Sequence, residues 1–368
     1  MPLLSDGQLI RGTYEVERFL GEGAFAEVYR VRHRFLGRQA MKVFKRSGMT
    51  LPEIEEMLGE AVLLSRIGHP NIVRVFDANV LETSDGLHGF FTMENVPGGS
   101  LDRFWRSYGS ALIPVETTIE IVKQVCRGMT LAHSEDPPIV HRDIKPQNIL
   151  VGYEADGLRA RIGDFGLAKA VNPLTLLATS AGTLTFKPPE TFSRNKADSC
   201  AADVWAIGVT LYLMLTDQLP FNIDADLGWT NAKVFESTPP SPCEFNVDVD
   251  PSLEAIVRLC MQPDPKERYN DARALLDALN GWQRPVSPPK AVEKKAISSE
   301  PSKSVLGFHS PIDSEEGKRL AALAVQKAKK EGCLFEAADI MEEAFNKSPM
   351  LRDKYANQVR LWRCGVSM

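Results

Sequence analysis

Two short segments in the middle of the chain gather residue types that could carry out chemistry. They are IVHRDIKPQNILV at 139–151 and IGDFGLAK at 162–169. Carboxylates such as Asp143 and Asp164 can accept a proton or bind a hard cation, and a lysine such as Lys145 can neutralise negative charge. A single aspartate in a loop is more often a cap or a turn former. The interpretation must therefore rest on the order and spacing of all these residues together.

These segments, together with GEGAFAEVY at 21–29 and QAMKVF at 39–44, resemble the catalytic domain of eukaryotic-like (Hanks-type) serine/threonine protein kinases. The resemblance covers about residues 14–282. It implies an α+β protein kinase fold with a small β-rich N-lobe, which contains one helix, and a larger helical C-lobe. It also implies transfer of the γ-phosphoryl group of MgATP to serine or threonine hydroxyls of a protein substrate, with Mn2+ as an alternative cation. Such a transition state spreads charge over the phosphoryl oxygens, so the protein must supply positioned groups and cations.

The resemblance assigns catalytic roles to several of these side chains. Lys42 matches the strand lysine that contacts the α- and β-phosphates, and its helix partner is Glu60, with Glu56 one turn earlier as the alternative. Asp143 matches the aspartate that accepts the proton of the substrate hydroxyl. Lys145 resembles the lysine that steadies the transferring phosphoryl group in serine/threonine kinases. Its presence favours Ser/Thr over Tyr specificity.

Asn148 and Asp164 match the two magnesium ligands of the family, and both offer the hard oxygen donors that this cation prefers. AGTLTFKPPE at 181–190 resembles the end of the activation segment, with Pro188 in place of the usual alanine. Thr183 is expected near the catalytic aspartate.

Further positions match parts of the family that support the site. Asp203 and Trp205 match the helix below the catalytic loop, and Glu190 is expected to pair with Arg268. The side chains expected to stack between the lobes are Leu64, Val75, His141 and Phe165.

The nucleotide site is assigned to the glycine loop, the lysine strand and the hinge TMENVPGGS at 92–100, with Met93 as gatekeeper. The implied nucleotide-binding residues are Gly21, Glu22, Gly23, Ala24, Phe25, Val28, Ala40, Lys42, Met93, Glu94, Val96, Leu150 and Asp164. The loop lacks the third glycine of the family and has Ala26 there. An alanine is tolerated where φ is negative, so we interpret the loop as a working phosphate clamp.

Regulation is suggested by Arg142, which precedes the catalytic aspartate as in kinases that are switched by activation-loop phosphorylation. Thr175, Thr179 and Ser180 are candidate acceptors, and our hypothesis is autophosphorylation of Thr179 first. Arg142 and Lys169 could pair with the phosphate and order the segment. The alternative is that these hydroxyls are ordinary residues of an exposed loop.

Hydrophobic patterning predicts the elements that position these residues. Strands are expected at 13–20, 26–34, 38–46, 71–80 and 89–96, a short β pair around 149–163, and helices at 52–68, 115–133, 201–216, 252–262 and 271–282. The kinase domain is placed at 10–283, with the N-lobe at about 10–95 and the C-lobe at about 98–283.

The chain beyond this domain changes in composition. Residues 284–314 are rich in Pro, Ser and Lys and are expected to form a flexible linker, followed by a helical segment at 315–368. Residues 324–349 resemble one tetratricopeptide-like unit, and a simple helical hairpin is the alternative. Because a single repeat cannot bury its own face, either the following helix completes it or it docks on the kinase domain or on a protein partner.

Composition excludes several classes of protein. A net charge of −5 over 368 residues gives no reason to expect nucleic acid or an anionic membrane as a partner. The six cysteines are widely spaced, which suits a reducing compartment. No secretory signal is visible and the apolar run at 204–215 is too short to span a bilayer, so we expect a cytoplasmic protein. The sequence leaves the oligomeric state open.

Two alternative functions are a pseudokinase and an adaptor that binds a partner through its helical C-terminal segment. Pseudokinases usually lose the strand lysine, the catalytic aspartate or a magnesium ligand, and none is lost here. A small-molecule kinase is disfavoured by HRDIKPQN and by the segment that resembles a peptide platform.

Overall fold

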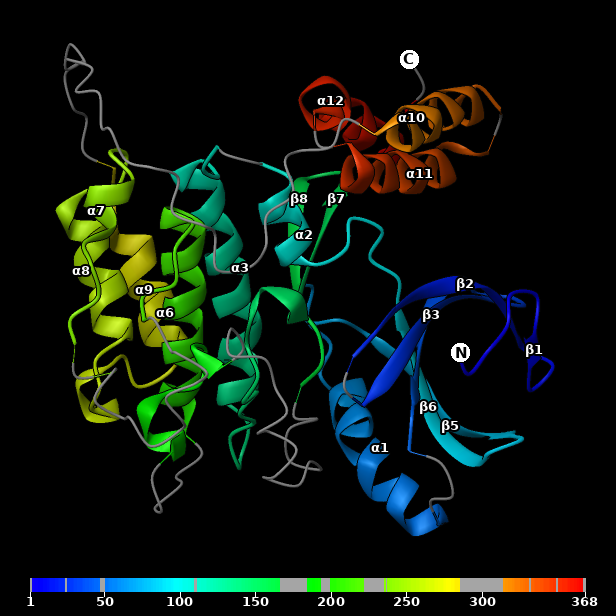
Figure 1. Cartoon of the computed structure of the whole chain (residues 1–368), viewed down its shortest axis with the longest axis horizontal. Coiled ribbons are helices and arrows are strands. Elements are labelled where there is room, and N and C mark those ends of the chain that lie inside the picture. The colour runs from blue at the N-terminus through cyan, green and yellow to red at the C-terminus, as the bar shows by residue number, and fades with distance from the viewer. Residues whose placement is uncertain are drawn as a thin grey trace.

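The structure is a computed structural model in which a β-rich lobe, a helical lobe and a C-terminal helical unit follow one another along the chain (Figure 1). It describes residues 2–23, 25–46, 50–108, 111–165, 184–192, 199–221, 235, 237–284, 314–330, 332–348 and 350–366. The side chains of 60–66, 192 and 353 are not part of this description. The predicted linker lies almost entirely outside the described residues.

The N-lobe is one antiparallel sheet with the strand order β1-β2-β3-β4-β6-β5. Its strands are β1 (Leu9–Ile10), β2 (Tyr14–Glu22), β3 (Ala26–His33), β4 (Gly37–Phe44), β5 (Val75–Thr83) and β6 (Gly86–Glu94). Helix α1 (Leu51–Arg66) packs against β5 and β6, with Ile54 fully buried over Gly89. In β3, Tyr29 and Val31 are fully buried, whereas Arg30 points to the opposite face because side chains alternate along a strand.

The C-lobe is built around helix α6 (Cys200–Thr216), which lies among α3, α8 and α9 and is buried along almost its whole length. Its other elements are α2 (Leu101–Arg106), α3 (Val115–His133), η1 (Pro146–Asn148), β7 (Ile149–Glu154), β8 (Gly157–Ile162), η2 (Pro189–Phe192), α7 (Pro242–Phe245), α8 (Pro251–Cys260), η5 (Pro265–Glu267) and α9 (Ala272–Gly281). The apolar run at 204–215 is therefore a core helix, as predicted. Within the described ranges, every helix is too short or too polar to cross a membrane.

The predicted helices and strands are found, with differences in some bounds and with several short elements that were not predicted. The strand expected from residue 71 begins at Val75, because Asn71 instead bonds the Gln124 side chain and the carbonyl of Ala160 in the C-lobe. Strand β1 and helix α2 were not predicted, since two and six residues are too few for a periodic pattern. Helix α2 is marked only by its N-cap, Ser100, whose hydroxyl accepts a hydrogen bond from Arg103 N.

The hinge between the lobes depends on two glycines. A Cβ atom at Gly98 would lie 2.1 Å from the carbonyl oxygen of Val151, so no other residue fits without displacing β7. Gly99 has φ +80°, a conformation that favours glycine, and its carbonyl accepts a hydrogen bond from Val151 N at 2.8 Å. The hinge is thereby fastened to β7, the strand that follows the catalytic loop.

The C-terminal unit consists of α10 (Glu315–Ala328), α11 (Leu334–Lys347) and α12 (Leu351–Arg363). The unit has its own core, in which Met341, Phe345 and Trp362 are fully buried. The helix after Ser348 thus completes the hairpin, which is one of the predicted arrangements. The tetratricopeptide resemblance itself stays a prediction.

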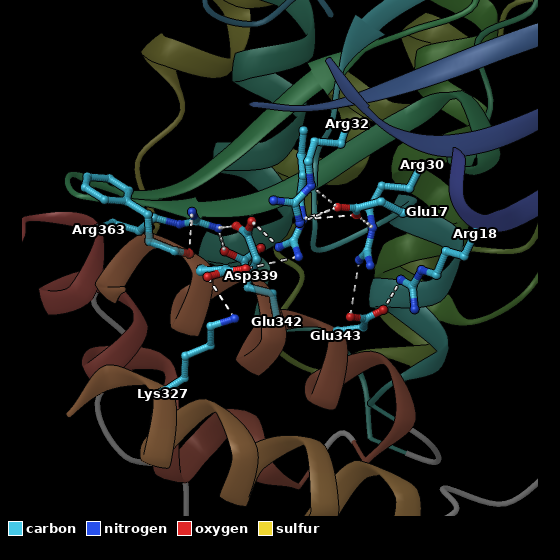
Figure 2. A network of polar contacts seen from close by, with 12 residues as sticks. Glu17, Arg18, Arg30, Arg32, Lys327, Asp339, Glu342, Glu343 and Arg363 are labelled. Carbon is cyan, nitrogen blue, oxygen red and sulfur yellow. Dashed lines mark hydrogen bonds and ion pairs between the residues drawn. The ribbon is translucent and has the colours of Figure 1, made fainter. Parts of the chain in front are cut away.

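This unit docks on the kinase domain through the acidic face of α11 and through α12, which packs against β7 (Figures 1 and 2). Glu343 forms ion pairs with Arg18 and Arg30, on β2 and β3. Arg38 of β4 reaches two further carboxylates of α11, Glu336 at 3.3 Å and Asp339 at 3.6 Å.

The same unit also contacts the hinge and the C-lobe. Asn346 donates a hydrogen bond to the carbonyl of Pro97, and the ring of Phe345 packs edge-on against Tyr153 of β7. The guanidinium of Arg352 lies 4.4 Å from the centre of the Phe104 ring in α2. The unit therefore touches both lobes and the segment that joins them.

Candidate active site

The catalytic loop begins on a buried carboxylate supplied by α6. Asp203 accepts hydrogen bonds from the backbone N–H groups of His141 at 2.7 Å and Arg142 at 2.8 Å, and it also contacts His133 Nε2 at 3.1 Å. His133 Nδ1 accepts from Ala272 N, so the ring hydrogen is on Nε2 and points to Asp203. The predicted support of the catalytic loop by this helix is confirmed.

His141 links the catalytic loop to the segment that carries Asp164. Its Nδ1 accepts from Asp143 N at 3.2 Å, so Nε2 carries the hydrogen and donates to the carbonyl of Gly163 at 2.9 Å. Burial lowers the pKa of His141, which keeps the ring neutral, and Phe165 lies against it with ring centroids 4.5 Å apart. His141 therefore joins the catalytic loop to the Asp164 segment.

The backbone is strained at two of these positions. Arg142 has φ 66° and Asp164 has φ 57°, in the left-handed region that non-glycine residues seldom occupy. Such conformations persist where the surrounding structure fixes them, and they concentrate at functional sites. Here Asp203 fixes the backbone of Arg142 by accepting its N–H, and Lys42 fixes Asp164 by contacting its carboxylate.

Asp143 lies at the centre of a cluster of donors. Its Oδ2 contacts Lys145 Nζ at 2.8 Å and Asn148 Nδ2 at 2.9 Å, and its Oδ1 contacts Lys187 Nζ at 3.0 Å. Burial alone raises the pKa of Asp143, but the charges of Lys145 and Lys187 outweigh it and hold the pKa below its usual value. The carboxylate is therefore ionised and able to accept a proton.

Lys42 lies in the middle of β4, buried and opposite Val28 of β3. Its Nζ contacts Asp164 Oδ1 at 2.7 Å, which joins the N-lobe sheet to the C-lobe. The side chain of Glu60, the predicted partner of Lys42, lies outside the described residues, and that of the alternative, Glu56, is exposed.

The residues expected around the nucleotide lie on strands that meet at the hinge. Ala40 of β4 and Met93 of β6 are register partners and are buried. Val28, Glu94, Val96 and Leu150 are partly exposed. Ala24, also expected there, lies outside the described residues.

The glycine loop joins β2 to β3, and Gly23 N donates to the carbonyl of Ala26 at 2.8 Å. A Cβ atom would meet no other atom within 4 Å at Gly21, and only the oxygen of Ala26, at 3.9 Å, at Gly23. Neither glycine has φ in the left-handed region. The fold itself therefore does not require glycine at these positions. The space around both glycines is open to a ligand. Ala26 is buried in β3 without positive φ, so the condition set for an alanine there is met.

Two oxygen donors are suited to a magnesium ion. Asn148 directs its amide nitrogen to Asp143, so its carbonyl oxygen remains to face a cation, and Asp164 offers a carboxylate that is 32% exposed. The described part of the chain holds no group of three or more His, Cys, Asp or Glu side chains that could bind a metal. A cation bound here would accordingly rely on phosphate oxygens and water for its remaining ligands, as Mg2+ usually does.

The segment 184–192 ends the predicted activation segment and is fixed to the C-lobe. Glu190 and Arg268 form a bidentate ion pair with both distances at 2.8 Å, as predicted, and Trp205 Nε1 donates to the carbonyl of Thr185. Thr183 and the loop hydroxyls Thr175, Thr179 and Ser180 lie outside the described residues, as does Lys169. Lys187 was given no role from sequence, because a loop lysine is ordinarily solvated.

A β-rich lobe and a helical lobe, joined by a glycine hinge and holding Lys42, Asp143, Asn148 and Asp164 between them, define a bilobal kinase fold. Residues 14–279 match the protein kinase domain family, and the chain therefore belongs to the protein kinase family.

Curated relatives include a probable serine/threonine-protein kinase of Clostridium acetobutylicum, 31% identical over 74% of this chain and 40% of its own length. Serine/threonine-protein kinase A of Synechocystis is 30% identical over 77% of this chain and 55% of its own length. This chain thus spans about half or less of the length of these relatives. The crystal structure of the PknI kinase domain of Mycobacterium tuberculosis is 25% identical with a TM-score of 0.57, and the match covers 75% of this chain and 98% of that one.

Proposed function

We propose that this chain is an ATP-dependent serine/threonine protein kinase, which transfers the γ-phosphoryl group of MgATP to a serine or threonine hydroxyl of a protein substrate. The observation that carries the proposal is the ionised Asp143 bracketed by Lys145 and Lys187, with Asn148 bonded to it. Serine/threonine specificity is supported by Lys145 and by the names of the relatives.

In this proposal each lobe contributes a different part of the chemistry. The open backbone at Gly21 and Gly23 approaches the phosphates, Lys42 contacts the α- and β-phosphates, and Asp143 takes the proton of the acceptor hydroxyl. Asn148 and Asp164 would hold the magnesium ion, which neutralises charge on the phosphates when bound.

Regulation by autophosphorylation of the activation loop remains part of the proposal, with Thr179 as the first site. Arg142, directly before Asp143, would bind the phosphate. Mass spectrometry of the purified chain after incubation with MgATP tests this part, and an unmodified loop in a fully active preparation contradicts it.

A partner of the C-terminal unit is a separate matter. Much of α11 is already engaged with β2, β3 and β4 through Glu336, Asp339 and Glu343. Helix α12 also contacts β7 and α2, so a protein partner would bind α10.

The proposed activity is tested by phosphate transfer from MgATP to a generic protein substrate. Asp143→Asn and Lys42→Ala are each expected to lower the rate by about 100-fold or more, because general-base and electrostatic groups usually contribute that much. Asp85→Asn, on an exposed turn after β5, is the matched control and should keep the wild-type rate. Equal rates in all variants contradict the assignments, and no transfer by the wild type favours the pseudokinase alternative.

A further inference from the structure

Lys187 is a buried lysine that reaches the catalytic loop from a segment 44 residues further along the chain. The residue is only 9% exposed, and its ammonium group donates to the carbonyl of Arg142 at 2.6 Å and to Asp143 Oδ1 at 3.0 Å. A buried ammonium is costly unless it is paired, so this contact is a defined part of the fold.

The backbone around Lys187 is held on both sides. Its N–H donates to the carbonyl of Leu184 at 2.9 Å, and Leu184 and Phe186 are themselves buried. Pro188 and Pro189 follow directly, and each fixes its own φ. The ammonium group is therefore delivered by a rigid turn, with little side-chain freedom left to lose when it contacts Asp143.

The two oxygens of Asp143 differ in the number of hydrogen bonds that they accept. Each carboxylate oxygen has two lone pairs. Lys145 and Asn148 fill those of Oδ2, whereas Lys187 takes one of Oδ1 and leaves the other for an incoming hydroxyl.

We propose that Lys187 is a positioning residue for phosphoryl transfer, which orients Asp143 so that Oδ1 accepts the proton of the acceptor hydroxyl. This inference rests on the kinase function proposed above. In the transfer step, the hydroxyl oxygen forms a bond to the γ-phosphorus and its proton passes to Oδ1. The bond from the γ-phosphorus to the β–γ bridging oxygen breaks, and its electron pair leaves with ADP.

The first test compares Lys187→Met, Lys187→Arg and the control Lys266→Met, in which an exposed C-lobe lysine is replaced. Lys187→Met should lower kcat by about tenfold or more while nucleotide affinity stays within about twofold, because Lys187 acts on Asp143 and not on ATP. Lys187→Arg keeps a charged donor and should recover part of the loss. A Lys187→Met enzyme with wild-type kcat, or with kcat and nucleotide affinity lowered together, overturns the inference.

The second test does not depend on activity. Reductive dimethylation of lysines, followed by mass spectrometry, should modify Lys187 much more slowly than Lys266 in the wild type. In Asp143→Ala the modification of Lys187 should accelerate severalfold, because its anionic partner is gone. Equal labelling of Lys187 in the two proteins overturns the inference. If the wild type transfers no phosphate, the proposed function fails, whereas the labelling still decides whether Lys187 is bound to Asp143.

Discussion

The catalytic loop and the C-terminal unit each place a carboxylate against cationic side chains, and the two carboxylates differ in their surroundings. Asp143 keeps a quarter of its side chain exposed and is contacted by two lysines and Asn148. Glu342 of α11 is fully buried, and Arg363 Nη2 contacts its Oε1 at 2.9 Å.

Their pKa values shift in opposite directions. The pKa of Asp143 is lowered, because its two lysines outweigh burial, whereas burial raises the pKa of Glu342 to about 7. Arg363 lowers the pKa of Glu342 only in part, since the same guanidinium group also contacts Asp339 at 2.7 Å. The charge of Asp339 raises the pKa of Glu342 further. At Asp143 the two lysine charges outweigh burial, whereas at Glu342 one shared guanidinium does not.

The largest effect on stability is expected when Arg363, the cation beside the buried Glu342, is removed. Arg363→Met leaves Glu342 and Asp339 without their shared partner, and breaking a buried ion pair costs about 3–5 kcal/mol. We expect the C-terminal unit to detach or open, visible as faster hydrogen exchange in α11 and α12 at pH 8. Arg360→Met, on the exposed face of α12, is the matched control and should leave exchange unchanged. Unchanged exchange in Arg363→Met would show that the pair does not hold the unit.

The cluster of residues around Asp143 could be predicted from the sequence. The contacts by which the C-terminal unit docks on the kinase domain could not. Asp143, Lys145 and Asn148 occur within six residues, so their spacing was enough to bring them together. Helices α3 and α6 were predicted within about one residue, because their apolar patterns are long. The actual contacts of Lys187 and Glu342 depend on segments that approach each other only in the fold.

Charge alone also gave no signal for the docking surface. Arg30 and Glu343 are ordinary surface residue types, and a run of charges on a helix usually indicates a solvated face. Only the folded structure, in which Glu343 of α11 lies within ion-pair distance of β2 and β3, shows that these charges meet (Figure 2). The contact between Lys42 and Asp164 likewise needs the structure, and the predicted pairing of Lys42 with Glu60 stays a prediction.

A smaller effect is expected from Glu342→Gln, and it depends on pH. Because the folded-state pKa is raised to about 7, from 4.5, folding favours the protonated form. The resulting contribution to the free energy of unfolding is fully present below about pH 4.5 and is lost as the pH rises through 7. Its size is about 1.4 kcal/mol for each unit by which the pKa is shifted. The groups facing Glu342 are Arg363, Asp339 and the backbone of β7 and of the hinge at Gly98.

Glutamine does not titrate, so the variant should be the more stable protein at pH 8, and the difference should shrink towards pH 5. Urea unfolding of both proteins across this range measures it, since other titrating groups cancel in the difference. A difference that does not vary with pH would mean that Glu342 stays ionised in the folded protein.

The smallest effect is expected from Glu343→Gln, the next residue of α11. Glu343 pairs with Arg30 and with Arg18, whose side chain is 42% exposed, and such partly solvated pairs contribute about 1 kcal/mol or less. The loss should be seen at low salt and should vanish near 1 M salt, because added ions screen the pair. Glu316→Gln removes a more exposed pair with Lys347 on the outer side of the unit and should leave docking unchanged at any salt concentration. Two neighbouring glutamates would then respond to different variables: Glu342 to pH because it is fully buried, and Glu343 to ionic strength because its partner Arg18 is partly exposed.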